Sequence, residues 1–205
     1  MDMAQAERAR RAGQSGQARK RLTARDWADA ALAAIGERGL AGVAVEPLAA
    51  RLGTTKGSFY WHFTNRDALI EAALGRWEEI CTEQIITAME SEPDPERRLR
   101  RLFATVTASA AEDPLEVSLL ATAGHPQVAV VLERVTVRRI GYVADLFEEL
   151  GFGAEEARRR GLLAYTSYLG HTQLSHAVPQ ALPVGVERGA YLESVMDMLL
   201  CGGPG

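Results

Sequence analysis

The chain has 205 residues, 47% hydrophobic and 24% charged, a composition typical of one large globular domain or two small ones. No run of 18 apolar residues occurs, which argues against a membrane span, and the charged N-terminus does not resemble a secretory signal. We therefore expect a cytoplasmic protein. Cys81 and Cys201 lie far apart and predict free thiols rather than a disulfide framework or a zinc cluster.

The net charge of −4 conceals an uneven distribution along the chain. Residues 1–66 hold 11 Lys and Arg against 6 Asp and Glu, whereas residues 67–205 hold 12 against 21. A basic end on an acidic body favours a protein that binds nucleic acid phosphates at one end. Residues 1–22 are rich in Arg, Gln, Gly and Ala and predict a flexible basic arm; whether this arm contacts DNA stays open.

The first ordered segment is predicted to begin with two helices. Thr23 and Asp26 have the spacing of a capping box, so we expect a helix over 24–38. A second, shorter helix is expected over 45–52, where the one proline falls in the first turn and is tolerated.

A third short helix, over 56–63, is expected after a sharp turn at Gly53. Thr55 is its expected cap. Phe59 and Phe63, four residues apart, would form its buried side. A short helix, a glycine turn and a second short helix with polar and aromatic outer residues are typical of a helix-turn-helix, which places its second helix in the major groove of DNA.

The remainder of the chain is predicted to be helical throughout. A long helix begins at a capping-box-like segment, 64–67, and continues to about residue 91. Further helices are expected over 96–111, 113–122, 127–150, 154–177 and 186–200. The sequence therefore predicts an all-α fold of about nine helices, with no convincing strand and no internal repeat.

The segment 53–69, which reads GTTKGSFYWHFTNRDAL, resembles the N-terminal DNA-binding signature of the tetracycline-repressor (TetR) family. The resemblance covers about residues 23–70, and beyond them only an all-helical body of the right length. It implies a basic arm over 1–22, a helix-turn-helix DNA-binding domain over 23–68, and a helical effector-binding and dimerisation domain over 69–205.

The resemblance also implies which residues bind DNA. Those facing the groove would be Lys56, Ser58, Trp61 and His62; those holding phosphates would be Thr54, Thr55, Tyr60 and Arg66; and Gly57 would let the backbone approach closely. One alternative stays open, in which Trp61 packs inside against Trp27 or Phe63. Ala44 and Glu46 depart from the family, which often has a capping Ser or Thr and a basic residue there, so we expect neither to contact DNA.

For the body, the resemblance implies an effector pocket and a homodimer built from helices 154–177 and 186–200. Candidate ligand-binding residues are Trp77, Cys81, Phe103, Tyr142, Tyr165, Tyr168 and His171, although aromatic residues at helical spacing also suit a plain core. Apolar positions of the last two helices, Leu162, Leu169, Leu192, Val195 and Leu199, suit either the core or the interface.

No metal or cofactor site is expected. His171 and His176 are five residues apart, which does not place them on one helix face, and the chain lacks a phosphate-binding loop, a nucleophile elbow and a paired-carboxylate motif. We therefore expect a DNA-binding transcriptional repressor, not an enzyme, that binds a palindromic operator and is released by a small-molecule effector. A regulator that answers to a protein partner or activates, and a helical enzyme or binding module, are the alternatives.

Overall fold

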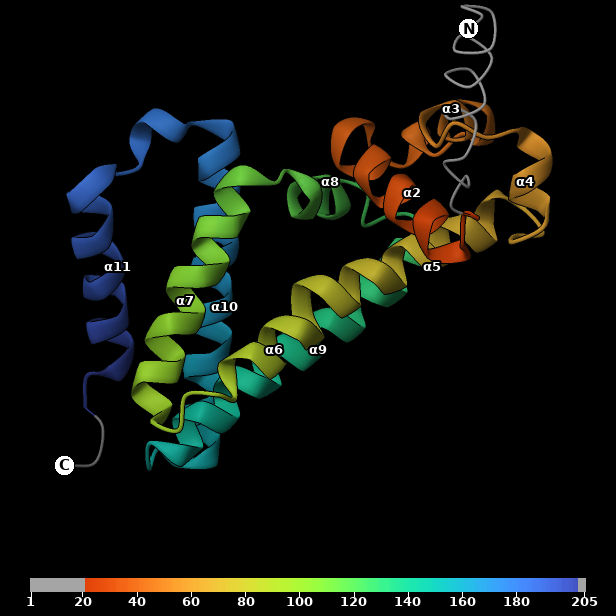
Figure 1. Cartoon of the computed structure of the whole chain (residues 1–205). Helices are drawn as coiled ribbons and strands as arrows, with labels where there is room; N and C mark the ends of the chain where they lie inside the picture. Colours follow the sequence, from red (N-terminus) through yellow and green to blue (C-terminus); the bar gives the residue numbers. More distant parts are fainter. Residues whose placement is uncertain (1–20, 203–205) are drawn as a thin grey trace, which may run out of the picture.

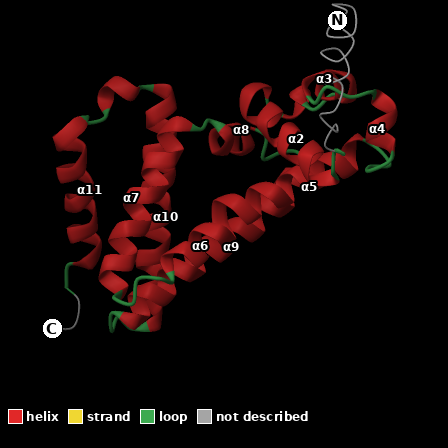
Figure 2. Ribbon diagram, in the orientation of Figure 1, coloured by secondary structure: helices red, strands yellow, loops and turns green. Residues whose placement is uncertain are grey.

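A computed structural model describes residues 21–202, and every regular element in that range is a helix (Figure 2). The helices are α2 (Ala24–Arg38), α3 (Val45–Arg51), α4 (Lys56–Tyr60), α5 (Arg66–Glu78), α6 (Gln84–Met89), α7 (Pro95–Glu112), α8 (Leu115–Ala121), α9 (Pro126–Glu149), α10 (Ala154–Ala177) and α11 (Gly185–Leu200). A π-helical turn, Glu79–Glu83, joins α5 to α6 into one run, so the nine predicted helices are confirmed within this range. Apart from its last two residues, the predicted basic arm lies outside the described range.

The helix starts show which local predictions hold. The capping box at Thr23 is confirmed: its hydroxyl accepts a hydrogen bond from the Asp26 amide, and its own amide donates to the Asp26 carboxylate at 2.7 Å. Thr55 is the N-cap residue of α4, as predicted, but its side chain makes no capping hydrogen bond. The cap of α5 is Asn65, whose side chain accepts a hydrogen bond from the Ala68 amide at 2.9 Å.

Helix α4 is shorter than predicted and ends at Tyr60 instead of residue 63. The amides of His62 and Phe63 both bond to the carbonyl of Phe59, which closes the last turn tightly. The chain then extends into Asn65, whose β-region backbone starts the next helix. Because Asn65 must leave helical backbone geometry to cap α5, α4 cannot continue through it and ends earlier than predicted.

The helix-turn-helix end of the molecule does not have a core of its own. Its buried residues, among them Trp27, Leu48 and Phe59, belong to one cluster with Leu119 of α8 and Val131 of α9. Figure 1 shows α5, α6 and α9 running side by side from the helix-turn-helix into the body. The predicted domain boundary after residue 68 thus falls inside a continuous helix and a shared core.

A second core holds the body together. It gathers Phe103 of α7, Phe147 of α9, Tyr165 of α10 and Met196 of α11. At the crossing of α9 and α10 the backbones approach so closely that a Cβ on Gly161 would lie 2.9 Å from the carbonyl oxygen of Ile140. Within residues 21–202, no helix is long and apolar enough to cross a membrane.

Candidate DNA-binding surface and effector cavity

The outer face of α4 presents large side chains to solvent. Trp61 is 86% exposed and Tyr60 is 59% exposed, whereas Phe59 is buried. Trp27 packs edge-on against Phe59 with ring centroids 5.5 Å apart, so the alternative in which Trp61 packs inside is wrong. Trp61 is the C-cap residue of α4. Exposing this large apolar ring costs solvation free energy, which favours a partner surface at this position.

A concave groove runs along the start of α4. Its lining consists of Arg21, Leu22, Leu52, Gly53, Thr54, Thr55, Gly57, Ser58, Trp61 and His62. Six of the nine predicted DNA-contact residues therefore lie together, while Lys56, Tyr60 and Arg66 lie outside this lining. The groove also brings in Arg21, which the sequence analysis placed in the arm. A guanidinium beside small hydroxyls and backbone amides is suited to DNA phosphates.

Lys56 is paired with the residue that departs from the family pattern. Its Nζ lies 2.7 Å from Oε1 of Glu46, and both side chains are more than half exposed. This hydrogen bond raises the pKa of Lys56 and lowers the pKa of Glu46. The cation nearest the start of α4 is thus partly neutralised by its neighbour.

Arg66 is turned toward the protein. Its Nε donates to the carbonyl of Val43 at 2.7 Å, and its Nη2 donates to the carbonyl of Leu40. A guanidinium has five N–H donors, so a phosphate contact would use those that remain. Arg66 therefore also positions the loop between α2 and α3.

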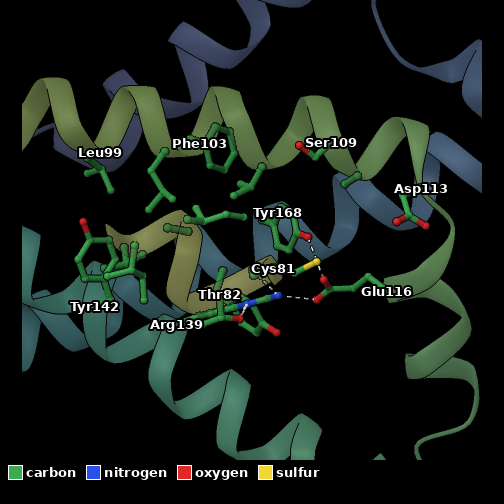
Figure 3. A pocket seen from close by; sticks show the side chains of 18 of the residues that line it. Cys81, Thr82, Leu99, Phe103, Ser109, Asp113, Glu116, Arg139, Tyr142 and Tyr168 are labelled. Carbon is green, nitrogen blue, oxygen red and sulfur yellow. Dashed lines mark hydrogen bonds and ion pairs between the residues drawn. The ribbon is translucent and has the colours of Figure 1, made fainter. Parts of the chain in front are cut away.

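The body contains a cavity between the two hydrophobic cores (Figure 3). Its volume is about 130 Å³, counted as space open to the centre of a water molecule, far more than a single water requires. The lining residues are Trp77, Cys81, Thr82, Ile85, Ile86, Leu99, Leu102, Phe103, Val106, Ser109, Ala110, Asp113, Leu115, Glu116, Arg139, Tyr142, Val143, Ala164, Tyr165, Tyr168 and Met196. Apolar walls with a few polar groups are typical of small-molecule sites.

Six of the seven predicted ligand-binding residues line this cavity, namely Trp77, Cys81, Phe103, Tyr142, Tyr165 and Tyr168. His171 does not. It is buried further along α10, and its ring stacks on Tyr191 of α11 with centroids 6.0 Å apart. His171 therefore contributes to the contact between α10 and α11.

A buried ion pair lies on one side of the cavity, and the sequence analysis missed it. Arg139 Nη1 donates to Glu116 Oε1 at 2.7 Å, and the two side chains are 13% and 7% exposed. Burial alone would lower the pKa of Arg139, but the charge of Glu116 holds it above its ordinary value. Tyr168 donates its hydroxyl to the other oxygen of Glu116 at 3.1 Å, so this carboxylate is well satisfied.

Arg139 connects the ion pair to the π-helical turn. Its Nε donates to the Thr82 hydroxyl at 2.9 Å and its Nη2 to the Cys81 carbonyl at 3.0 Å. The guanidinium also lies over the Trp77 ring, 5.2 Å from its centroid. One side chain of α9 thus contacts α5, the π-helical turn and α8, and π-helical turns are common at functional sites.

Helix α8 faces the cavity on one side and the DNA-binding end on the other. Glu116 lines the cavity, whereas Leu119 is fully buried in the first core. The Ser118 hydroxyl donates to the carbonyl of Ile35, near the end of α2, at 2.8 Å. A displacement of Glu116 would therefore act directly on α2.

The thiol in the cavity is not a reactive one. Burial raises the pKa of Cys81 to about 11, and only the thiolate is a strong nucleophile. Among residues 21–202, no three His, Cys, Asp or Glu side chains are grouped so as to hold a metal ion.

Comparison with known proteins finds a family match at the helix-turn-helix end. Residues 28–73 match the model of the bacterial regulatory proteins of the tetR family, a stretch that includes the whole groove-forming turn and α4. The helix-turn-helix end of this chain, helical throughout the described residues, is therefore similar to the N-terminal part of tetR-family regulatory proteins. A search of curated proteins gives no match.

Solved structures share the fold over nearly the whole chain. A transcriptional regulator from Rhodococcus sp. Rha1 is 20% identical with a TM-score of 0.73, covering 89% of this chain and 98% of that one. SmeT, the repressor of a multidrug efflux pump of Stenotrophomonas maltophilia, is 19% identical with a TM-score of 0.64 over 89% and 90%. AibR, solved with isovaleryl coenzyme A and operator DNA, is 16% identical with a TM-score of 0.62 over 85% and 96%.

Proposed function

We propose that this protein is a ligand-responsive repressor that binds a palindromic operator as a homodimer and leaves it when a small molecule fills the body cavity. The observation that carries the proposal is the position of the cavity, which takes Trp77 and Leu115 from the first core and Phe103 and Tyr168 from the second. A ligand there touches both parts at once. Acting on bacterial DNA, the protein would work in the cytoplasm.

The proposed transmission uses two connections between the cavity and the DNA-binding end. One is α5, which carries Trp77 in the cavity wall and begins at Arg66, a short turn after α4 ends at Tyr60. The other is α8, through Glu116 and Ser118. A ligand that favours one arrangement of these helices shifts the spacing of the two recognition helices in the dimer, with a coupling of about 1–3 kcal/mol between the sites.

The proposed dimer interface consists of α10 and α11. Helix α11 buries only Met196 and Leu199, while Val186 is 93% exposed and Met198 is 69% exposed. Of the positions that the sequence left undivided, Leu162 is 51% exposed and suits the interface, and the other four pack against the second core. A two-fold dimer would place two recognition helices on successive half-sites. SmeT is a repressor and AibR was solved with operator DNA; both share this fold, which supports operator binding by this chain.

DNA binding is tested by gel shift and fluorescence anisotropy with the DNA upstream of the protein's own gene. Replacing both Lys56 and Tyr60 by Ala should weaken binding to all sequences and lower the salt slope by about one for the lost lysine contact. Arg97→Ala, which removes an exposed cation from α7, is the matched control and should bind normally. Unchanged binding by the double variant would refute the role of α4.

Effector release separates the proposal from its main alternative. A small molecule that frees the operator from the purified dimer supports the repressor. Release only by a second protein would favour the partner-dependent regulator, and no binding to any DNA would favour a helical binding module.

A further inference from the structure

The cavity lining carries more negatively than positively charged side chains. Of its 21 lining residues, three are charged: Arg139, Glu116 and Asp113. Arg139 and Glu116 neutralise each other at 2.7 Å. Asp113 pairs with no cationic side chain in the described range 21–202; its Oδ1 accepts a hydrogen bond from the Leu115 amide at 2.9 Å. The lining therefore carries one surplus negative charge.

The single cation of the cavity is poorly available to an anionic ligand. Arg139 already donates to Glu116, to the Thr82 hydroxyl and to the Cys81 carbonyl. Drawing its guanidinium away would leave a buried, unpaired carboxylate, which is strongly unfavourable. The acidic balance of residues 67–205, with 21 Asp and Glu against 12 Lys and Arg, opposes an anion further.

The surplus carboxylate, that of Asp113, lies where the polar group of a ligand could reach it. Asp113 directly follows α7, and Ser109 lies one turn earlier; both line the cavity at the end nearest α8 (Figure 3). Both residues are exposed, so this end is open to solvent. Asp113 and Glu116 both raise the pKa of the Cys81 thiol, which indicates that their negative field reaches the interior.

From these observations we infer that the cavity takes a small lipophilic amine, with its apolar body among the side chains of α7 and α10 and its ammonium group beside Asp113 and Ser109. The inference rests on the proposed function, because it names the class of effector for the same cavity. The ammonium group keeps part of its hydration at the open end, so its desolvation is incomplete. The apolar body replaces water along Phe103, Val106 and Tyr168.

The position of the ammonium group beside Asp113 also suits transmission of ligand binding to the helix-turn-helix. The Asp113 carboxylate holds the start of α8 through the Leu115 amide. A Cβ added to Gly36 of α2 would lie 3.7 Å from Asp113 Oδ1, so the carboxylate adjoins the DNA-binding end. An ammonium group that attracts Asp113 therefore acts where α8 meets α2.

Three probes of one shape and different head charge test the inference: 4-phenylbutylamine, 4-phenylbutanol and 4-phenylbutyrate. Their dissociation constants are measured by calorimetry on the full chain without DNA at neutral pH. We expect the amine to bind about two- to fivefold more tightly than the alcohol, as for a partly exposed ion pair, and the acid at least about tenfold more weakly than the alcohol. Tightest binding by the acid, or no binding by any probe, would overturn the inference.

The variant Asp113→Asn tests whether the ammonium group of the ligand binds beside Asp113. It keeps an oxygen for the Leu115 amide and loses the charge, so the amine should bind no better than the alcohol, whose affinity stays the same. The control Glu112→Gln removes an equal charge next door, outside the lining, and should keep the preference. An amine preference that survives in Asp113→Asn refutes the site.

Operator release is measured separately, so the two proposals can fail independently. If the amine binds in the expected order and never frees the operator, the ligand class stands and the repressor mechanism fails. If the acid binds best and frees the operator, the mechanism stands and the ligand class fails.

Discussion

The ion pair between Arg139 and Glu116 offers the sharpest test of how the cavity is built. Glu116→Gln keeps the size of the side chain and an oxygen for the guanidinium, but removes the negative charge. At an effective dielectric constant of about 20, unit charges about 4 Å apart attract by about 4 kcal/mol. Breaking one side of a buried pair typically costs about 3–5 kcal/mol. Because Arg139 retains the Thr82 hydroxyl and the Cys81 carbonyl as acceptors, we expect a loss near the lower end, about 3 kcal/mol.

Urea unfolding followed by circular dichroism at fixed protein concentration measures this loss. With a slope of about 3 kcal/mol per molar urea for a chain of this size, the midpoint should fall by about 1 M. The double variant Arg139→Met with Glu116→Gln removes both charges and should recover about 2 kcal/mol relative to Glu116→Gln alone. Glu133→Gln, an exposed position on α9, is the control and should stay within about 0.5 kcal/mol.

The reasoning would be refuted by either of two results. One is a loss below about 0.5 kcal/mol for Glu116→Gln, which would mean that solvent screens the pair. The other is strict additivity of the two substitutions in the double variant, since charges in contact must show a coupling energy.

Three further predictions concern the helices that carry the site. Gly161→Ala should destabilise the folded protein by about 1–3 kcal/mol because the added Cβ would collide with the backbone of α9. The control Gly141→Ala, with open space around its Cβ, should stabilise it by up to about 1 kcal/mol. Equal thermal unfolding midpoints for the two variants would contradict the close crossing. Ala44→Ser should add about 1 kcal/mol by capping α3, whose N-cap now lacks a side-chain acceptor, and an unchanged urea midpoint would argue against it. Glu46→Gln should free Lys56 and tighten operator binding about two- to fivefold in anisotropy titrations; weaker binding would instead give Glu46 a contact of its own.

The helix-turn-helix could be predicted closely because its signals are local. The capping box at Thr23 and the turn glycine at residue 53 act within a few residues of themselves, and the predicted helix 24–38 agrees with α2. At the start of α4 only the expected side-chain hydrogen bond is absent. Thr55 has the right type and position, yet its hydroxyl makes no capping bond, which leaves it in the lining of the groove.

The cavity could be predicted only in part because its polar side depends on distant contacts. Five aromatic residues and Cys81 were predicted correctly as lining residues. Arg139 and Glu116, however, are 23 residues apart and meet only in the folded chain. A signal was present. Arg139 lies four residues after Val135 and three before Tyr142, so it interrupts the buried stripe of α9, and a charge in such a stripe predicts a buried partner.

A shared core also changes what an effector must do. A ligand shifts an equilibrium only through different affinities for the two states, and a cavity inside one rigid core would keep its shape while the DNA-binding end moved. Here the walls come from both cores, with Trp77 and Leu115 on one side and Phe103 and Tyr168 on the other. Any rotation of α5 and α8 against α7 and α10 therefore changes the shape of the cavity itself. The coupling between ligand binding and the DNA-binding end therefore follows from the position of the cavity. The Arg139–Glu116 pair joins α9 to α8 between the two cores. Substitutions in this pair should change the coupling free energy most.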